Sequence, residues 1–110
     1  MRYALLMYAD PTHTVAMTDA QLAEVKRKHE ALGEELGPRL VGGAGLALPH
    51  ETTLVRASGV TSGPIAGDVV EHLTAYYEVE TTLEHAREIA ARILDHHVTS
   101  VEVRFIHDHV

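Results

Sequence analysis

The segment Val60–Glu80, VTSGPIAGDVVEHLTAYYEVE, decides the fold because it joins turn chemistry to an aromatic strand. It begins with the turn sequence Ser62-Gly63-Pro64, continues through a short polar stretch, and ends in a run centred on Tyr76 and Tyr77. Glycine and proline mark turns, and tyrosine is enriched in strands. We therefore predict a strand at the end of the segment, preceded by a polar loop that edges a pocket.

The length and composition of the chain describe one small acidic domain. The chain has 110 residues, a formal net charge of −7 and no cysteine. The length predicts a single domain over residues 1–110. The negative charge disfavours nucleic-acid binding, and the lack of cysteine excludes disulfides and thiolate catalysis. All apolar runs are shorter than a membrane span or a signal-peptide core, which predicts a cytoplasmic protein without a membrane partner.

Two amphipathic helices are expected, each starting at a threonine. Thr18 precedes Gln21 with the spacing of a capping box, and a Gly-Pro pair ends this helix near Leu36. Thr81 and Glu84 repeat the capping-box spacing at the start of the second helix. The apolar face of the second helix comprises Leu83, Ala86, Ile89, Ala90, Ile93 and Leu94.

The buried face of the first helix includes a histidine. Apolar residues recur there at helical spacing, and His29 occupies one position in their row. The complete row is Leu22, Val25, His29, Leu32 and Leu36. We interpret the basic group Lys26-Arg27-Lys28 as part of the solvated face of this helix.

Short apolar or alternating runs predict the strands. The run Tyr3–Tyr8 is apolar on both faces, as in a strand that is covered twice. Within Arg39–Leu48, the stretch Gly42–Gly45 marks a bulge, a bend, or the close approach of another chain or a ligand. The remaining strand runs are Thr52–Ala57, its hairpin partner Val60–Thr61, and Thr99–Ile106.

The order of these elements predicts a fold class. It reads strand, helix, strand, hairpin, strand, helix, strand, and without the hairpin it is the ferredoxin-like plan βαββαβ. In that plan, two helices cover one face of an antiparallel sheet. The doubly apolar first strand then needs cover on the other face, and a second copy of the chain is the simplest source. We therefore predict an α+β, ferredoxin-like domain with an extra β-hairpin, forming a homodimer through its sheet face.

The order of several short strings resembles that of the YCII-related proteins, in the branch named for a DGPF motif. The strings are Arg2–Tyr8, Gly42–Leu46, Thr52–Arg56, Val60–Ala66, Tyr76-Tyr77 and Val101–Arg104. The resemblance implies a dimeric α/β barrel with a pocket between the sheet and the helices of each subunit. It also implies a helix histidine in that pocket, sometimes with an aspartate, and His29 falls where such a histidine would lie.

The resemblance also implies an activity. The broader fold group includes isomerases, dechlorinating enzymes and cofactor-free oxygenases that act on small aromatic or lactone substrates. We therefore expect cofactor-free acid/base chemistry, of isomerase or lyase type, on a small cyclic or aromatic metabolite. The sequence departs from the DGPF pattern, because Ser62 replaces the motif aspartate and Ile65 replaces the phenylalanine. The alternative is therefore a non-catalytic ligand-binding or regulatory dimer.

Two residues are candidates for catalysis. His29 titrates near neutral pH and is suited to act as a general base, whereas the alternative is a core histidine bonded to a backbone carbonyl. Asp10 is placed to orient a histidine or to bind a polar ligand group. An aspartate that precedes a proline is otherwise a turn residue.

Three residues are candidates for ligand binding. Ser62 can donate a hydrogen bond, but no nucleophile elbow surrounds it and a turn serine fits equally well. Asp68 is the candidate for a displaced motif aspartate. Tyr76 and Tyr77 point to opposite faces of their strand, and we prefer Tyr76 for the pocket because Tyr77 shares its face with apolar residues.

No cofactor and no metal site are predicted. The chain has nine histidines, but they show no recognised ligand spacing. We interpret His96-His97 and the histidines of the tail His107-Asp108-His109 as solvated surface residues. The expected partners are a second copy of the chain and a small-molecule ligand.

Overall fold

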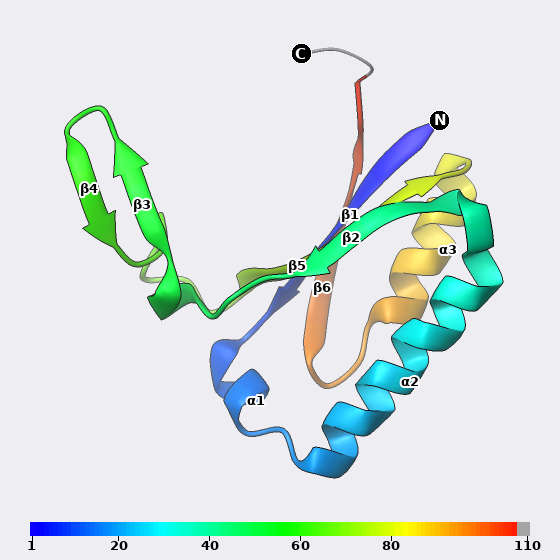
Figure 1. The fold of residues 1–110 in the computed structure, drawn as a ribbon, viewed down its shortest axis with the longest axis horizontal. Coiled ribbons are helices and arrows are strands. Elements are labelled where there is room, and N and C mark those ends of the chain that lie inside the picture. Colours follow the sequence, from blue (N-terminus) through cyan, green and yellow to red (C-terminus); the bar gives the residue numbers. More distant parts are fainter. Residues whose placement is uncertain (108–110) are drawn as a thin grey trace.

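The fold is α+β, as a computed structural model of the chain shows for residues 1–107 (Figure 1). One antiparallel sheet has the strand order β2-β5-β1-β6 and carries two helices. Its strands are β1 (Arg2–Ala9), β2 (Leu40–Gly45), β5 (His72–Glu80) and β6 (Val98–Phe105). Helix α2 (Asp19–Leu36) joins β1 to β2, and α3 (Leu83–Ile93) joins β5 to β6. This order and connectivity are consistent with the predicted ferredoxin-like plan.

Short elements complete the chain. Strands β3 (Thr53–Arg56) and β4 (Gly59–Ser62) form the predicted hairpin as a separate two-stranded sheet. Figure 1 shows this hairpin, in green, projecting away from the body of the domain. The other short elements are α1 (Pro11–Val15), η1 (Gly37–Arg39) and η2 (Pro49–Glu51). Helix α1 was not predicted, although an aspartate followed by proline is also a helix-start signal.

Both long helices begin at threonine caps, one of them a residue later than predicted. The capping box at Thr18 is confirmed, with both of its hydrogen bonds present. At α3 the cap is Thr82, whose hydroxyl accepts a hydrogen bond from the backbone N–H of His85. The prediction of Thr81 was wrong because its backbone N–H still bonds the carbonyl of Met1. Thr81 therefore extends the strand pairing, and the helix begins beyond it.

The hydrophobic core lies between the sheet and the helices. It comprises Tyr3, Leu5, Met7, Leu32, Leu36, Val79, Ala86, Ile89, Ile93 and Val98. The predicted strand at Tyr3–Tyr8 is confirmed as β1, in which Leu5 is fully buried and Leu6 on the other face is half-buried. Leu5 lies opposite Tyr77 of β5, and Leu6 lies opposite Tyr76. Tyr77 therefore belongs to the face that the helices cover, and Tyr76 belongs to the open face.

The two halves of α2 differ in burial. Leu32 and Leu36 in its second half are buried against the sheet. Three residues assigned to buried helix faces are instead exposed, namely Leu22 by 48%, Leu83 by 40% and Leu94 by 48%. Each of these lies at or near the end of its helix, where the sheet no longer covers it. The middle of α2, at Val25 and His29, lies beside an open space.

Candidate functional site

A cavity of about 420 Å³ lies between the middle of α2 and the sheet. This volume falls within the range of about 300–1,000 Å³ that is usual for small-molecule sites. Its apolar walls include Met7, Val25, Leu46, Ala75 and Val98. Its polar side chains are His29, Thr74, Tyr77 and His97. A mostly apolar chamber with a few polar groups is suited to a small organic molecule.

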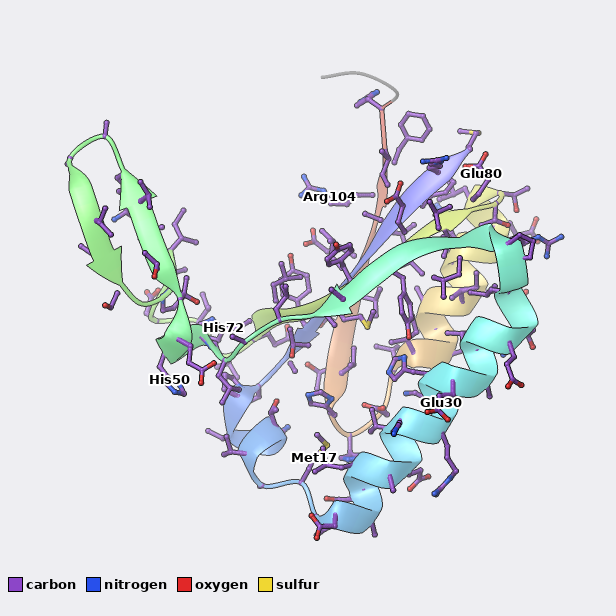
Figure 2. The ribbon with its side chains drawn as sticks, in the orientation of Figure 1. Met17, Glu30, His50, His72, Glu80 and Arg104 are labelled. Carbon is purple, nitrogen blue, oxygen red and sulfur yellow. The ribbon has the colours of Figure 1, made fainter. Side chains whose placement is uncertain are left out.

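His29 and Tyr77 form a hydrogen-bonded pair in this cavity. Nδ1 of His29 lies 2.5 Å from the Tyr77 hydroxyl, and the two rings meet edge to face with centroids 5.6 Å apart. The side chains come from α2 and β5, and both line the cavity between that helix and the sheet. Glu30, labelled in Figure 2, follows on the exposed side of α2. The bond uses Nδ1 of His29 and leaves Nε2 for a ligand.

Gly43 allows Tyr77 to reach this position. It lies opposite Tyr77 in the β2–β5 ladder. A Cβ atom at Gly43 would lie 2.7 Å from Cδ1 of Tyr77 and 2.7 Å from the backbone oxygen of Tyr76. Such distances are far inside van der Waals contact, so the tyrosine ring rests against bare backbone. Of the alternatives predicted for the glycine-rich stretch, a bulge or similar irregularity is present as a register shift between Leu40 and Gly42. The close contact at Gly43 is made by a side chain of the neighbouring strand of the same chain.

Burial keeps both members of the pair uncharged near neutral pH. It lowers the pKa of His29, and the nearby Lys28 ammonium lowers it further, while Asp95 opposes the shift. Burial also raises the pKa of the Tyr77 hydroxyl. His29 is thus a neutral imidazole at neutral pH, which is the form that can accept a proton.

Lys28 ties α2 to the turn that follows α3. Its Nζ lies 2.5 Å from Oδ2 of Asp95 and 2.7 Å from the carbonyl oxygen of Ile93. Asp95 also accepts hydrogen bonds from the backbone N–H groups of His97 and Val98. Burial alone would raise the pKa of Asp95, but the bonds from Lys28 and from these amides hold it below its ordinary value. The prediction of a solvated face was therefore wrong for Lys28, whose side chain is only 30% exposed.

His97 lines the cavity, so the prediction that it is a solvated surface residue was wrong. It is half-buried, and its Nε2 lies 3.0 Å from Oγ1 of Thr14 in α1. Its Nδ1 is buried and has no hydrogen-bond partner within residues 1–107. Since a buried N–H without an acceptor is rare, the neutral ring carries its proton on Nε2 and donates it to Thr14. His97 precedes a strand in a loop, where no periodic pattern could have revealed its burial.

Asp10 and the loop candidates lie outside the cavity. The Asp10 carboxylate caps α1, accepting bonds from the Thr12 hydroxyl at 2.8 Å and its N–H at 2.9 Å, and these bonds lower the pKa of Asp10. Ser62 is exposed at the end of β4, and Asp68 is exposed in the loop before β5. Neither these three candidates nor the loop of residues 63–71 contributes to the cavity walls. Tyr76 does contribute, but its side chain belongs by register to the open face.

The loop instead edges a more open groove on the other side of the sheet. This groove is lined by Tyr8, Val69, Val70, Glu71, Ser100 and Glu102. The Tyr8 hydroxyl donates to Glu102, and the hydroxyl groups of Thr99 and Ser100 donate to Glu71. The carboxylates are therefore engaged by neighbouring side chains. The loop was predicted to edge a pocket. The loop does edge this groove, but His29 does not line it.

Within residues 1–107, no group of three or more histidine, aspartate or glutamate side chains is arranged to hold a metal ion. Across the same residues, no helix combines the length and apolarity needed to cross a bilayer. His96 and His107 are exposed, as predicted, whereas Asp108 and His109 lie outside the described residues.

The chain was also compared with known proteins. A scan against protein-family models and a search of curated proteins both found no match. The site is therefore interpreted from its own geometry, in which His29, Tyr77 and His97 line one apolar cavity.

Proposed function

We propose that this chain is a YCII-like protein that performs cofactor-free acid/base chemistry on a small cyclic or aromatic molecule. The observation that carries this proposal is the His29–Tyr77 pair, which lies at the wall of a largely apolar cavity. The reaction class is isomerisation or elimination begun by removal of a proton from carbon. Proton transfer by a positioned imidazole suits this class.

The mechanism assigns different tasks to the two nitrogens of His29. In the proposed mechanism the neutral ring carries its proton on Nδ1 and donates it to the Tyr77 oxygen, which holds the ring in place and leaves the Nε2 lone pair free. The Nε2 lone pair then accepts a proton from a carbon next to a carbonyl group, and the bonding electrons move to the carbonyl oxygen as an enolate. The imidazolium exchanges its proton with the solvent or keeps it, and then returns a proton to the same carbon or to another one. Tyr77 thus takes the orienting role that was predicted for Asp10, because the Asp10 side chain instead caps α1.

Deuterium exchange tests this function without knowledge of the natural substrate. We expect the protein to accelerate exchange of the α-protons of 2-indanone in D₂O, followed by proton NMR. His29→Gln should remove the acceleration, because an amide cannot accept the proton. His96→Gln is the matched control at an exposed histidine and should exchange like the unmodified protein. Acceleration that survives in His29→Gln would rule the mechanism out.

The same assay carries a pH prediction. The base acts only when neutral, so the exchange rate should fall as the pH drops through the pKa of His29. Because burial and Lys28 lower that pKa, the fall should occur below the ordinary titration range of imidazole. A profile centred above that range would contradict the assignment of His29 as the base.

Ligand binding without turnover is the second candidate function. It is favoured by the placement of Asp10, Ser62 and Asp68, which leaves no carboxylate in the cavity walls formed by the described residues. An imidazole paired only with a neutral hydroxyl is a weaker acid/base system than one paired with a carboxylate. Binding of 2-indanone without any exchange dependent on His29 would select this function.

We also propose that two copies associate through the open face of the sheet. Leu6 and Tyr76 face each other there between charged groups, and Ala4 lies opposite Arg104, which Figure 2 labels on β6. This arrangement resembles an interface with an apolar centre and a polar rim. Size-exclusion chromatography with light scattering should give the mass of two chains. Leu6→Glu should give one chain, whereas Val15→Glu, at an exposed position on α1, should leave the mass unchanged.

A monomeric mass for the unmodified protein at micromolar concentration would refute the dimer. The proposed cavity lies on the other side of the sheet, so its chemistry does not depend on this result.

A further inference from the structure

Gly45 leaves room in the cavity where another residue would fill it. It lies opposite Ala75, which in turn lies opposite Met7, a residue buried beneath the helices. Side chains on that side of the ladder face the helices, so a side chain at Gly45 would project into the cavity that it lines. A Cβ atom there meets no other atom within 4 Å. This distinguishes Gly45 from Gly43, where Tyr77 already fills the space.

Gly45 therefore presents bare backbone in one wall of the cavity, next to Gly43, whose backbone the Tyr77 ring already covers. A glycine inside a strand often marks a place where a ligand approaches the main chain closely. Peptide planes without side chains form a flat surface, and a flat ring makes the most contact with such a surface. Val25 of α2 and Met7 of β1 contribute apolar side chains to the same chamber.

The side chains that line the cavity carry no fixed charge. The polar ones are His29, His97, Tyr77 and a threonine, and burial disfavours the charged form of both histidines. The nearest ammonium, on Lys28, is already paired with Asp95 at 2.5 Å. An anionic ligand would therefore be buried without a partner, which is costly. An uncharged ligand avoids that cost and can still use Nε2 of His29.

We propose that the cavity binds a flat, uncharged ring compound bearing a carbonyl group, with one face of the ring against the backbone of Gly45. The inference rests on the proposed function only for the placement of the carbonyl side of the ring at His29. Gly45 determines whether the ring fits, and the uncharged lining determines the class of ligand.

A matched pair of probes tests the ligand class. 2-Indanone is flat and uncharged, and indane-2-carboxylate has the same ring system with a negative charge. In NMR titrations of the ¹⁵N-labelled protein at neutral pH, 2-indanone should bind and shift the amide resonance of Gly45. Indane-2-carboxylate should bind at least about tenfold more weakly, a difference of about 1.4 kcal/mol.

A graded series at Gly45 tests the position. Gly45→Ala should weaken 2-indanone binding, and Gly45→Val should weaken it by about tenfold or more, because each added methyl group takes space from the ring. The control is Gly67→Val in an exposed loop, where a Cβ also meets nothing within 4 Å. The amide spectrum verifies the fold of each variant, and Gly45→Ala alone suffices should valine prevent folding.

Each outcome bears on one claim. Equal or tighter binding of the carboxylate, no binding of 2-indanone, or unchanged binding by the Gly45 variants would overturn the inference. Binding of 2-indanone that depends on Gly45, without exchange that depends on His29, would uphold the inference and reject the acid/base function. The two claims therefore fail separately.

Discussion

An Ile89→Ala variant should lose about 2–5 kcal/mol of unfolding free energy, as truncations of fully buried aliphatic side chains do. Ile89 is 0% exposed and lies in the core beneath the sheet, in the same cluster as Leu5 and Ile93. Removing its side chain leaves a cavity that the closely packed neighbours cannot fill. A domain of this size has only about 5–15 kcal/mol of stability, so the loss would be a large fraction of the total.

Ile65→Ala is the matched control, because it removes the same atoms from a side chain that is 77% exposed. It should change the unfolding free energy by no more than about 0.5 kcal/mol. Urea denaturation followed by circular dichroism, at one protein concentration for all variants, measures both values. Equal losses at the two positions would contradict the placement of the core between α3 and the sheet.

A Gly43→Ala variant should separate Tyr77 from His29. The added Cβ would lie 2.7 Å from both the Tyr77 ring and the backbone oxygen of Tyr76. The ring or the strand must therefore move, and overpacking of this kind typically costs about 1–3 kcal/mol. Movement of the ring carries its hydroxyl away from Nδ1 of His29. Without that hydrogen bond, the imidazole proton can shift between Nδ1 and Nε2.

The ¹⁵N chemical shifts of the His29 ring report the tautomer directly and need no substrate. Gly43→Ala should change them in the same direction as Tyr77→Phe, which removes the hydroxyl without any clash. Gly45→Ala is the control on the same strand and face, where an added Cβ meets nothing within 4 Å, and it should leave the shifts unchanged. If Tyr77→Phe changes the shifts and Gly43→Ala does not, Gly43 is not a positioning residue for the pair.

Much of the fold could be predicted because its signals are local. The signals for the strand, helix and hairpin each depend on residues close together in the chain, namely the apolar run Tyr3–Tyr8, the capping box at Thr18 and the turns around the hairpin. The errors arose where distant segments decided the outcome. Thr81 bonds the carbonyl of Met1, and Lys28 pairs with Asp95. No short pattern contains either contact.

The candidate site shows the same division. Helical spacing alone predicted that His29 lies on the buried face of its helix. Strand alternation alone predicted that Tyr76 and Tyr77 point to opposite faces of the sheet. Which tyrosine faces His29 was decided by the pairing of β5 with β1, and the role of Gly43 was decided by the pairing of β2 with β5. Periodicity is a property of the local backbone, so the sequence by itself determines which residues share a face. Only the tertiary structure decides what that face meets, because cross-strand register and helix packing depend on residues far apart in the chain.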